Sequence, residues 1–302
     1  MQYIETAAAK INLFLHICGR RSDGFHELES LVCFGVDACD RISLKFGDPT
    51  ALPPMISMSG PFASNITGPN LVATALERLV VRISKPEQRK LKIRALDIEK
   101  NLPVAAGIGG GSGDAAAVLR AVKLCHRELA DQIDWLALAT ELGADVPVCL
   151  GAEASWMTGI GERVTPAGPL PELAVVLVNP QVSVPDNKTA QVFKNLNAKK
   201  IAEEKVRRDI PNVELDFSSA RGLIEGLTHL RNDLEEPVCH LMPSVNEVFS
   251  ALKQIPDCKL VRLSGAGPTV FGLFENMYAA NIATKQIKNA HRDWWVVPTR
   301  VY

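Results

Sequence analysis

The chain has 302 residues, of which 47% are hydrophobic and 22% charged, with a formal net charge of −1 at pH 7. This composition is typical of a soluble globular protein with room for a sizeable core, and it excludes a disordered or fibrous chain. The near-zero net charge, without a long basic run, argues against a nucleic-acid surface, and no apolar stretch reaches the roughly 20 residues of a membrane span.

In the first half of the chain, apolar segments with a strand or helix period alternate irregularly. The expected strands lie within Tyr3–Cys18, with a turn around Ala8–Asn12, and over Leu31–Val36, Asp40–Phe46 and Leu91–Ile98. The expected helices span Pro69–Val81, Asp114–Ala130 and Asp134–Leu142.

Pro166–Pro171 contains three prolines and a glycine and predicts a domain boundary, which gives domains 1–165 and 166–302. After it we expect an apolar strand in LAVVLVNP, an amphipathic segment over Lys188–Phe193, a loop over Asn197–Arg208, a helix over Pro243–Ile255, and a hairpin of Lys259–Leu263 with Thr269–Phe274. This mixture of hairpins and helices indicates an α+β fold.

The most informative segment is PVAAGIGGGSGDAAAVLRAV, Pro103–Val122, which joins an expected strand to an alanine-rich helix. Its glycines keep side chains away, so that backbone N–H groups can converge on an anion beside the positive end of the helix dipole. The arrangement suits a triphosphate. A flexible turn with close helix packing is the structural alternative, but so many glycines are costly in chain entropy without a ligand.

Two familiar phosphate-binding motifs do not fit this segment. A Walker A loop ends in Gly-Lys-Ser/Thr, and the chain has no Gly-Lys dipeptide. The G-x-G-x-x-G fingerprint fails because Ser112 and Asp114 stand where its last glycine would be. A second glycine turn, LSGAGPTVFGLF (Leu263–Phe274), is either a tight hairpin or the second of two backbone walls around one ligand.

Three motifs occur in a fixed order: AKINLFLHI, the glycine loop, and the SGAGP turn. Together they resemble the GHMP kinase family, from Ala9 to about Phe274. The resemblance implies a two-domain α+β fold, an N-terminal domain that carries the ATP-binding glycine loop, an active site in the interdomain cleft, and ATP with Mg²⁺. The segment RSDGFHEL is similar to that of family members whose acceptor is the 2-hydroxyl of 4-diphosphocytidyl-2-C-methyl-D-erythritol.

The resemblance places the catalytic pair at Lys10, in AAAKINL, and Asp145, in LGADVPVCL. An aspartate can accept the proton of the attacking hydroxyl, and a lysine can keep it ionised and offset charge on the transferred phosphoryl group. A surface lysine and a helix-capping aspartate are the structural alternatives.

For the acceptor, the resemblance implies Asn12, which would share a face with Lys10 if this segment is a strand, and His26, which would hydrogen-bond the cytosine. Phe25 would stack on that base, where many relatives carry tyrosine, and Phe193 would supply its opposite face. Gly265 in the second glycine turn completes the expected acceptor site.

For ATP, the resemblance implies contacts from one asparagine and from the glycine loop. These residues are Asn70, Pro103, Gly107, Gly109, Gly110, Gly111, Ser112 and Gly113. Asn70 is also a plausible helix N-cap. Ser112 would bind a phosphate oxygen or Mg²⁺, and Asp114 would either cap the helix or face Mg²⁺.

Three other functions compete with this interpretation: a GHMP kinase for mevalonate, phosphomevalonate or homoserine, a silent nucleotide-binding protein, and a dinucleotide-dependent oxidoreductase. The cytosine-directed segment argues against the first, Lys10 and Asp145 against the second, and the missing fingerprint against the third. The seven cysteines form no C-x-x-C pair, and the N-terminus has no targeting character. We therefore expect a cytoplasmic enzyme with free thiols and a small-molecule partner, monomeric or weakly dimeric.

Overall fold

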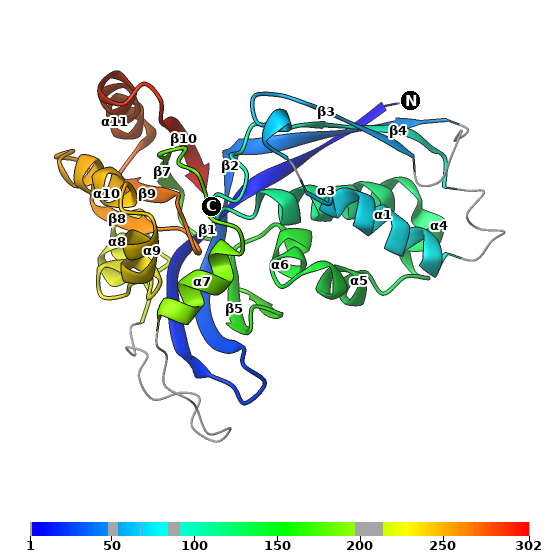
Figure 1. The fold of residues 1–302 in the computed structure, drawn as a ribbon, viewed down its shortest axis with the longest axis horizontal. Helices are drawn as coiled ribbons and strands as arrows, with labels where there is room; N and C mark the ends of the chain where they lie inside the picture. Colours follow the sequence, from blue (N-terminus) through cyan, green and yellow to red (C-terminus); the bar gives the residue numbers. More distant parts are fainter. Residues whose placement is uncertain (1, 48–53, 67, 84–90, 197–213, 302) are drawn as a thin grey trace. The chain divides into compact units, whose positions relative to one another are not determined.

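The computed structural model describes residues 2–47, 54–66, 68–83, 91–196 and 214–301 (Figure 1). The chain forms two compact units, neither of which is continuous in sequence. The first unit comprises Met1–Ala9, Cys39–Val104 and Gly109–Ala152, and the second comprises Lys10–Ala38, Ala105–Ile108 and Glu153–Tyr302. The mixture of helices and antiparallel strands confirms the α+β class. The domain boundary at residues 165 and 166 stays a prediction.

Two long N-terminal strands each contribute to both units: β1 (Gln2–Arg20) and β2 (His26–Phe46). The turn expected around Ala8–Asn12 is therefore wrong, because the backbone stays extended and β1 pairs with β2. Ala8–Asn12 contains no glycine or proline, and its side chains are nearly all buried. The two strands expected over Leu31–Val36 and Asp40–Phe46 are likewise parts of one strand.

The first unit is a small sheet covered by helices. Strand β4 (Ile93–Glu99) pairs antiparallel with Arg41–Phe46 of β2 and parallel with β3 (Met55–Ser59). The helices, with one short 3-10 turn, are η1 (Ala63–Asn65), α1 (Leu71–Arg82), α3 (Gly110–Cys125), α4 (Arg127–Ala130), α5 (Trp135–Leu142) and α6 (Val146–Gly151). Fully buried aliphatic side chains such as Leu79, Leu96 and Val118 form its core, each stabilising the fold by about 1.5–3 kcal/mol.

The helix expected over Asp114–Ala130 differs from the structure at both ends. It begins four residues earlier, at Gly110, because Gly109 adopts the left-handed conformation of the N-cap with φ 69°. It ends at Cys125, and His126 separates it from α4.

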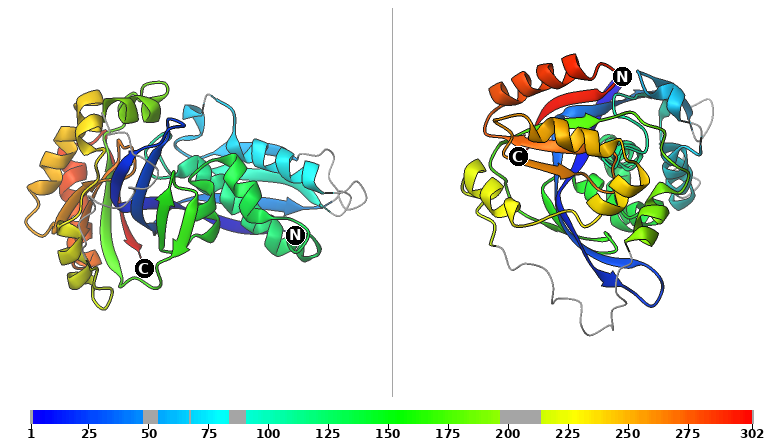
Figure 2. Two further views of the ribbon diagram at one scale, coloured as in Figure 1. Left: turned by 90° about the horizontal axis from the view of Figure 1, so that it is seen from below. Right: turned by 60° about the vertical axis from the view of Figure 1, so that its left-hand side comes forward.

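The second unit contains a four-stranded antiparallel sheet in the order β10-β7-β9-β8. Its strands are β7 (Leu173–Asn179), β8 (Leu260–Leu263), β9 (Val270–Phe274) and β10 (Trp295–Val301). The second unit also contains β5 (Ser155–Gly159), which pairs antiparallel with Leu28–Val32 of β2, and β6 (Arg163–Pro166), which pairs antiparallel with β5. Its helices are α7 (Lys188–Asn195), α8 (Ala220–Thr228), α9 (Glu235–Leu241), α10 (Val245–Lys253) and α11 (Met277–Ala290). Helices α10 and α11 pack on one face of the sheet (Figures 1 and 2). Val176, Val248 and Ile287 belong to the buried core between these elements.

The expected hairpin is confirmed, since Leu260–Leu263 pairs antiparallel with Val270–Leu273. All seven cysteines are free thiols. The loop expected over Asn197–Arg208 lies outside the described residues. Within the part of the chain that the structure describes, no helix is both long enough and apolar enough to cross a membrane.

Candidate active site

The first part of the glycine loop, Ala105–Ile108, packs against the second glycine turn, and both belong to the second unit. Gly107 has φ 76°, and a Cβ there would lie 2.6 Å from Gly267 N and 2.7 Å from Ser264 O. Gly265 approaches just as closely, since its Cβ would lie 2.8 Å from Gly107 O. These glycines therefore allow two backbones to touch each other. The sequence left open whether the two glycine turns line one ligand from two sides. At Gly107 the two backbones are in direct contact, so at this point they leave no space for a ligand between them.

The second part of the loop, in the first unit, leaves backbone exposed to a ligand. Gly109 caps α3, and the first N–H groups of the helix have no partner inside it. A Cβ at Gly111 would meet no atom within 4 Å, and one at Gly113 would meet only ordinary contacts with Ala7 and Ala8. The open space at Gly111, next to a positive helix end, is suited to a phosphate group.

Ser264 and Ile108 hold the backbone of Lys10. Lys10 N donates to Ile108 O at 2.9 Å, while Ser264 Oγ lies 3.4 Å from Lys10 O and 3.2 Å from Gly107 O. The side chain of Lys10 is buried, with 4% of its surface exposed. The two glycine turns thus fix the strand segment that carries the expected catalytic lysine.

Asn12, two residues further along β1, presents a carbonyl oxygen without a partner among the described residues. Its Nδ2 donates to Ser30 Oγ at 2.8 Å, and Ser30 Oγ donates to Phe14 O at 2.5 Å. Because the single hydroxyl proton of Ser30 is used on Phe14, the Asn12 group that faces Ser30 has to be the amide nitrogen. Asn12 Oδ1 is therefore held as a free, buried acceptor.

Lys188, at the start of α7, joins the same two turns from another side. Its Nζ donates to Ala105 O at 2.9 Å and, at closer range, to Gly267 O. No carboxylate of the described residues pairs with this amine, and burial lowers the pKa of Lys188 to about 8. The sequence pattern gave no sign of this contact, since Lys188 looks like one polar residue of an amphipathic helix.

The segment Arg21–His26 forms a tight turn that presents two rings. Phe25 O accepts from Arg21 N at 2.7 Å, Asp23 Oδ1 accepts from Phe25 N at 3.0 Å, and Gly24 has φ 92°. Phe25 is 57% exposed, whereas His26 stacks on Phe193 with ring centroids 4.9 Å apart. Burial, together with the Arg20 charge, lowers the pKa of His26 and favours the neutral imidazole. The structure thus brings His26 and Phe193 together from distant parts of the sequence.

Asn70 and Asp145 belong to the first unit. Asn70 caps α1, where its Oδ1 accepts from Val72 N at 2.9 Å, so its structural role is established. Its Nδ2 lies 3.9 Å from the Met58 sulfur, a weak partner that a nucleotide base could replace. Asp145 is half-buried at the N-cap position of α6 but makes no side-chain capping bond.

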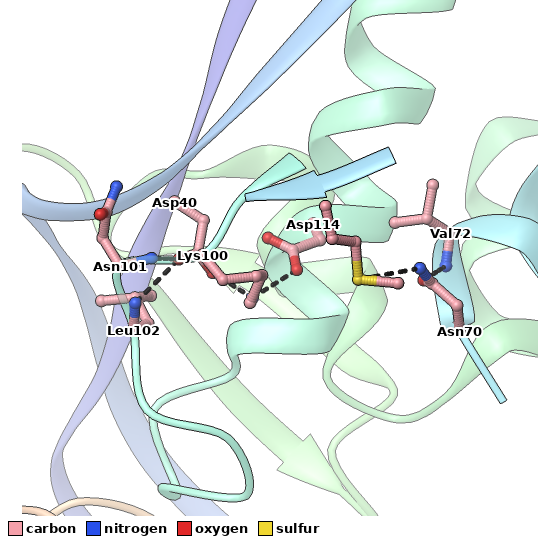
Figure 3. A network of polar contacts seen from close by, with 8 residues as sticks. Asp40, Asn70, Val72, Lys100, Asn101, Leu102 and Asp114 are labelled. Atoms are coloured by element: carbon pink, nitrogen blue, oxygen red, sulfur yellow. Dashed lines mark hydrogen bonds and ion pairs between the residues drawn. The ribbon is translucent and has the colours of Figure 1, made fainter. Parts of the chain in front are cut away.

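Asp114 does not cap α3, because the cap is Gly109 and Asp114 lies one turn into the helix. Its Oδ2 pairs with Lys100 Nζ at 2.5 Å, and Lys100 also pairs with Asp40 (Figure 3). Burial and the nearby Asp40 raise the pKa of Asp114 against the opposing effect of Lys100. Sequence reasoning found an acid beside the glycine loop but missed its lysine and the second acid.

Two family models match the chain. The GHMP kinases N terminal domain matches residues 70–152, and the GHMP kinases C terminal domain matches residues 210–292. Among curated relatives, a 4-diphosphocytidyl-2-C-methyl-D-erythritol kinase of Rhodospirillum rubrum is 40% identical over 99% of this chain and 92% of its own length. A protein of the same description from Dinoroseobacter shibae is 43% identical over 97% of this chain and 93% of its own.

Solved structures agree with the sequence matches. A crystal structure of 4-(cytidine 5'-diphospho)-2C-methyl-D-erythritol kinase superposes with a TM-score of 0.74 at 29% identity, covering 100% of this chain and 99% of that chain. A homoserine kinase from Cytophaga hutchinsonii has a TM-score of 0.63 at 16% identity over 99% and 94% of the two chains, which shows a shared fold alone. The chain belongs to the GHMP kinase family.

Proposed function

We propose that this protein transfers the γ-phosphoryl group of ATP to the 2-hydroxyl of 4-diphosphocytidyl-2-C-methyl-D-erythritol. The observation that carries the proposal is full-length identity of about 40% to curated kinases for this acceptor. The exposed Gly111 in the first turn of α3 and the ring pair of His26 with Phe193 support it, since they suit a triphosphate and a pyrimidine respectively. The products are ADP and the 2-phosphate of the acceptor.

Phosphoryl transfer depends mainly on positioning and electrostatics, so few reactive side chains are required. We infer that the Asp145 carboxylate accepts the proton of the attacking hydroxyl and that the Lys10 ammonium offsets charge on the phosphoryl oxygens. The held backbone of Lys10 favours this role, because a buried ammonium on a fixed strand needs little reorganisation during the reaction.

Asn12 is proposed to orient the acceptor. Its Oδ1 is buried and has no partner among the described residues, and a buried acceptor without a donor is costly. A hydroxyl of the acceptor would supply that donor. Asn12 shares the strand face of Lys10, so a hydroxyl held by its Oδ1 would lie beside the ammonium that assists transfer.

His26, Phe193 and Phe25 are proposed to bind the cytosine. The neutral imidazole favoured at His26 can both donate and accept hydrogen bonds, as a pyrimidine edge requires. Phe193 already stacks on His26, and the exposed Phe25 ring lies on the same turn. Phenylalanine at position 25 keeps a ring for stacking and lacks the hydroxyl of a tyrosine.

ATP-dependent transfer commonly uses Mg²⁺, whose role is to neutralise charge on the phosphates. Within the described residues no group of three or more His, Cys, Asp or Glu side chains could hold a metal alone. Mg²⁺ bound through ATP phosphates needs only one or two protein oxygens, however. The Ser112 hydroxyl, in the first turn of α3 and half-buried, is an oxygen of the required kind. We propose Ser112 as the residue that holds the ion or a phosphate oxygen.

Two expectations about partners stay predictions: the protein binds no nucleic acid, and it is a monomer or weak homodimer. The test of the proposed function is ADP release from ATP and Mg²⁺ with four acceptors in parallel: the cytidyl diphospho-methylerythritol, mevalonate, phosphomevalonate and homoserine. We expect turnover with the cytidyl compound alone. Turnover with another acceptor would refute the cytosine site, and ATP binding without any turnover would favour a silent nucleotide-binding protein.

A second experiment tests the catalytic pair. Asp145→Asn should abolish turnover and leave the Kd for ATP close to that of the wild type, because the amide cannot accept the proton. A variant that loses ATP binding to the same degree would mark Asp145 as a structural residue of α6.

A further inference from the structure

Lys100 is a buried cation held between two buried acids in the first unit. Its Nζ donates to Asp114 Oδ2 at 2.5 Å and pairs still more closely with Asp40 Oδ2. The exposed fractions are 3% for Lys100, 0% for Asp40 and 4% for Asp114. Asp40 is 60 positions from Lys100 in the sequence, so only the fold brings this cluster together.

Asp40 anchors the chain where β4 ends and the glycine loop begins. Its Oδ1 accepts from Asn101 N at 2.6 Å and from Leu102 N at 2.8 Å, while its other oxygen faces Lys100. Figure 3 shows Asn101 and Leu102 on the Asp40 side of the cluster. Three hydrogen bonds on one buried carboxylate fix the position of these two peptide groups.

Asp114 fixes the other end of the loop. It lies in α3 one turn after Gly110, and its Oδ2 accepts a hydrogen bond from Lys100 Nζ. A Cβ at Gly110 would lie 3.8 Å from Lys100 Nζ, so the ammonium also lies directly beside the first residue of the helix. Lys100 therefore contacts the anchor of Leu102 and the start of α3 at once.

We propose that Lys100 is a positioning residue for nucleotide binding, which fixes both ends of the glycine loop through Asp40 and Asp114. The proposal rests on the proposed function for its ligand, ATP. A glycine-rich segment loses much conformational entropy when it becomes ordered. Holding its two ends in place before the nucleotide arrives reduces that cost and increases affinity.

A purely structural role is the competing explanation, and energetics argue against it. A buried salt bridge contributes little net stability compared with apolar residues of similar volume, because desolvation of the charges offsets their attraction. One oxygen of this cluster, Asp114 Oδ1, is also left without a partner among the described residues. The cluster is therefore a poor device for stability, whereas its contacts suit the fixing of geometry.

The test distinguishes two effects of a substitution at Lys100: loss of the link between Asp40 and Asp114, and burial of carboxylates without a cation. Lys100→Met alone leaves two buried carboxylates and is expected to unfold more easily. The double variant Lys100→Met, Asp114→Asn removes one of those charges and keeps the bonds from Asp40 to Asn101 and Leu102. Lys100→Arg keeps a cation that can bridge two acids. Lys45→Met, an exposed lysine of β2, is the matched control.

Two readouts are measured for each variant: Kd for ATP by calorimetry, and amide hydrogen exchange of residues 101–115 without nucleotide. We expect the double variant to keep a cooperative thermal transition, to bind ATP at least tenfold more weakly, and to exchange at least tenfold faster over 101–115 alone. Lys100→Arg should recover part of both losses, and Lys45→Met should match the wild type.

The proposal is overturned if the double variant, or Lys100→Met alone should the double variant not fold, binds ATP within twofold of the wild type with unchanged exchange over 101–115. These readouts do not involve the acceptor. A failure of the acceptor assignment would leave them intact, whereas a wild-type protein that bound no ATP would overturn the role of Lys100 in nucleotide binding whatever the exchange result.

Discussion

The two parts of the glycine loop should respond oppositely to the same substitution, Gly to Ala. At Gly107 the added methyl group would lie 2.6 Å from Gly267 N and 2.7 Å from both Gly267 O and Ser264 O. All three atoms are backbone, so a side-chain rotation cannot relieve the contact. Gly107 also has φ 76°, a conformation that costs an alanine about 1–2 kcal/mol. At Gly111 the methyl group would meet no atom within 4 Å.

The magnitudes follow from these contacts. Overpacking commonly costs about 1–3 kcal/mol, so Gly107→Ala should destabilise the protein by roughly 2–5 kcal/mol in total. A shift of about 2–4 °C per kcal/mol converts this loss to a Tm lower by roughly 4–20 °C. Gly111→Ala should instead stabilise by up to about 1 kcal/mol, because alanine is the better residue inside a helix.

At Gly111 the substitution should weaken ATP binding although it stabilises the protein. If its backbone N–H binds a phosphate, a methyl group in that open space removes a charge-assisted hydrogen bond of about 1.5–3 kcal/mol. That corresponds to a Kd roughly 10- to 150-fold higher. Differential scanning calorimetry with and without ATP measures both quantities in one experiment. A Gly111→Ala protein that is more stable and binds ATP normally would refute the assignment of this space to a phosphate.

Three further predictions concern the second unit. Ser30→Ala leaves Asn12 Nδ2 without its hydrogen-bond partner, at a cost of about 1–3 kcal/mol, and should lower kcat/KM for the cytidyl substrate roughly tenfold with KM for ATP unchanged. Ser30→Thr keeps the hydroxyl and should restore kcat/KM. Equal losses for both substrates would contradict the proposed role of Asn12. Because burial and Arg20 lower the pKa of His26, kcat/KM for the cytidyl acceptor should fall only below about pH 6.5, and His26→Gln should remove that decline if the imidazole binds the base. Burial lowers the pKa of Lys188 to about 8, so the unfolded chain binds more protons than the folded one between about pH 8 and 10.5. The free energy of unfolding, measured by urea titration, should therefore rise over that interval by at most about 3 kcal/mol relative to that of Lys188→Met. If the free energies of the two proteins changed in parallel with pH, the amine would not be buried as described.

Local sequence motifs indicate several residues of the proposed site. Lys10 and His26 lie in short segments whose residue order is informative on its own, and the hairpin around Gly265 follows from two apolar strands separated by glycines. The helix after the glycine loop was expected, but its start at Gly110 was not, since only the left-handed Gly109 sets that boundary.

Contacts between residues far apart in sequence could not be predicted from any one segment. Lys100 stands in an ordinary polar sequence, and its partner Asp40 looks like one more residue at a strand start. Lys188 pairs with no carboxylate of the described residues, and its partners are the backbone carbonyls of Ala105 and Gly267. Side-chain periodicity carries no information on which carbonyls a buried amine will meet. The turn expected around Ala8–Asn12 was wrong for a related reason, because pairing with β2 keeps β1 extended.

The proposed reaction forms one new bond, from the γ-phosphorus of ATP to the 2-hydroxyl oxygen of the cytidyl acceptor. In a 2-C-methyl-erythritol this hydroxyl sits on a carbon without hydrogen, so a phosphate there has no hydrogen three bonds away from its phosphorus. Proton-coupled ³¹P NMR of the reaction with ATP and Mg²⁺ therefore tests the claim directly. We predict one new phosphomonoester signal, an unsplit line, that grows in step with ADP. A doublet or triplet would place the phosphate on another hydroxyl, and the absence of any new phosphomonoester would contradict the proposed reaction itself.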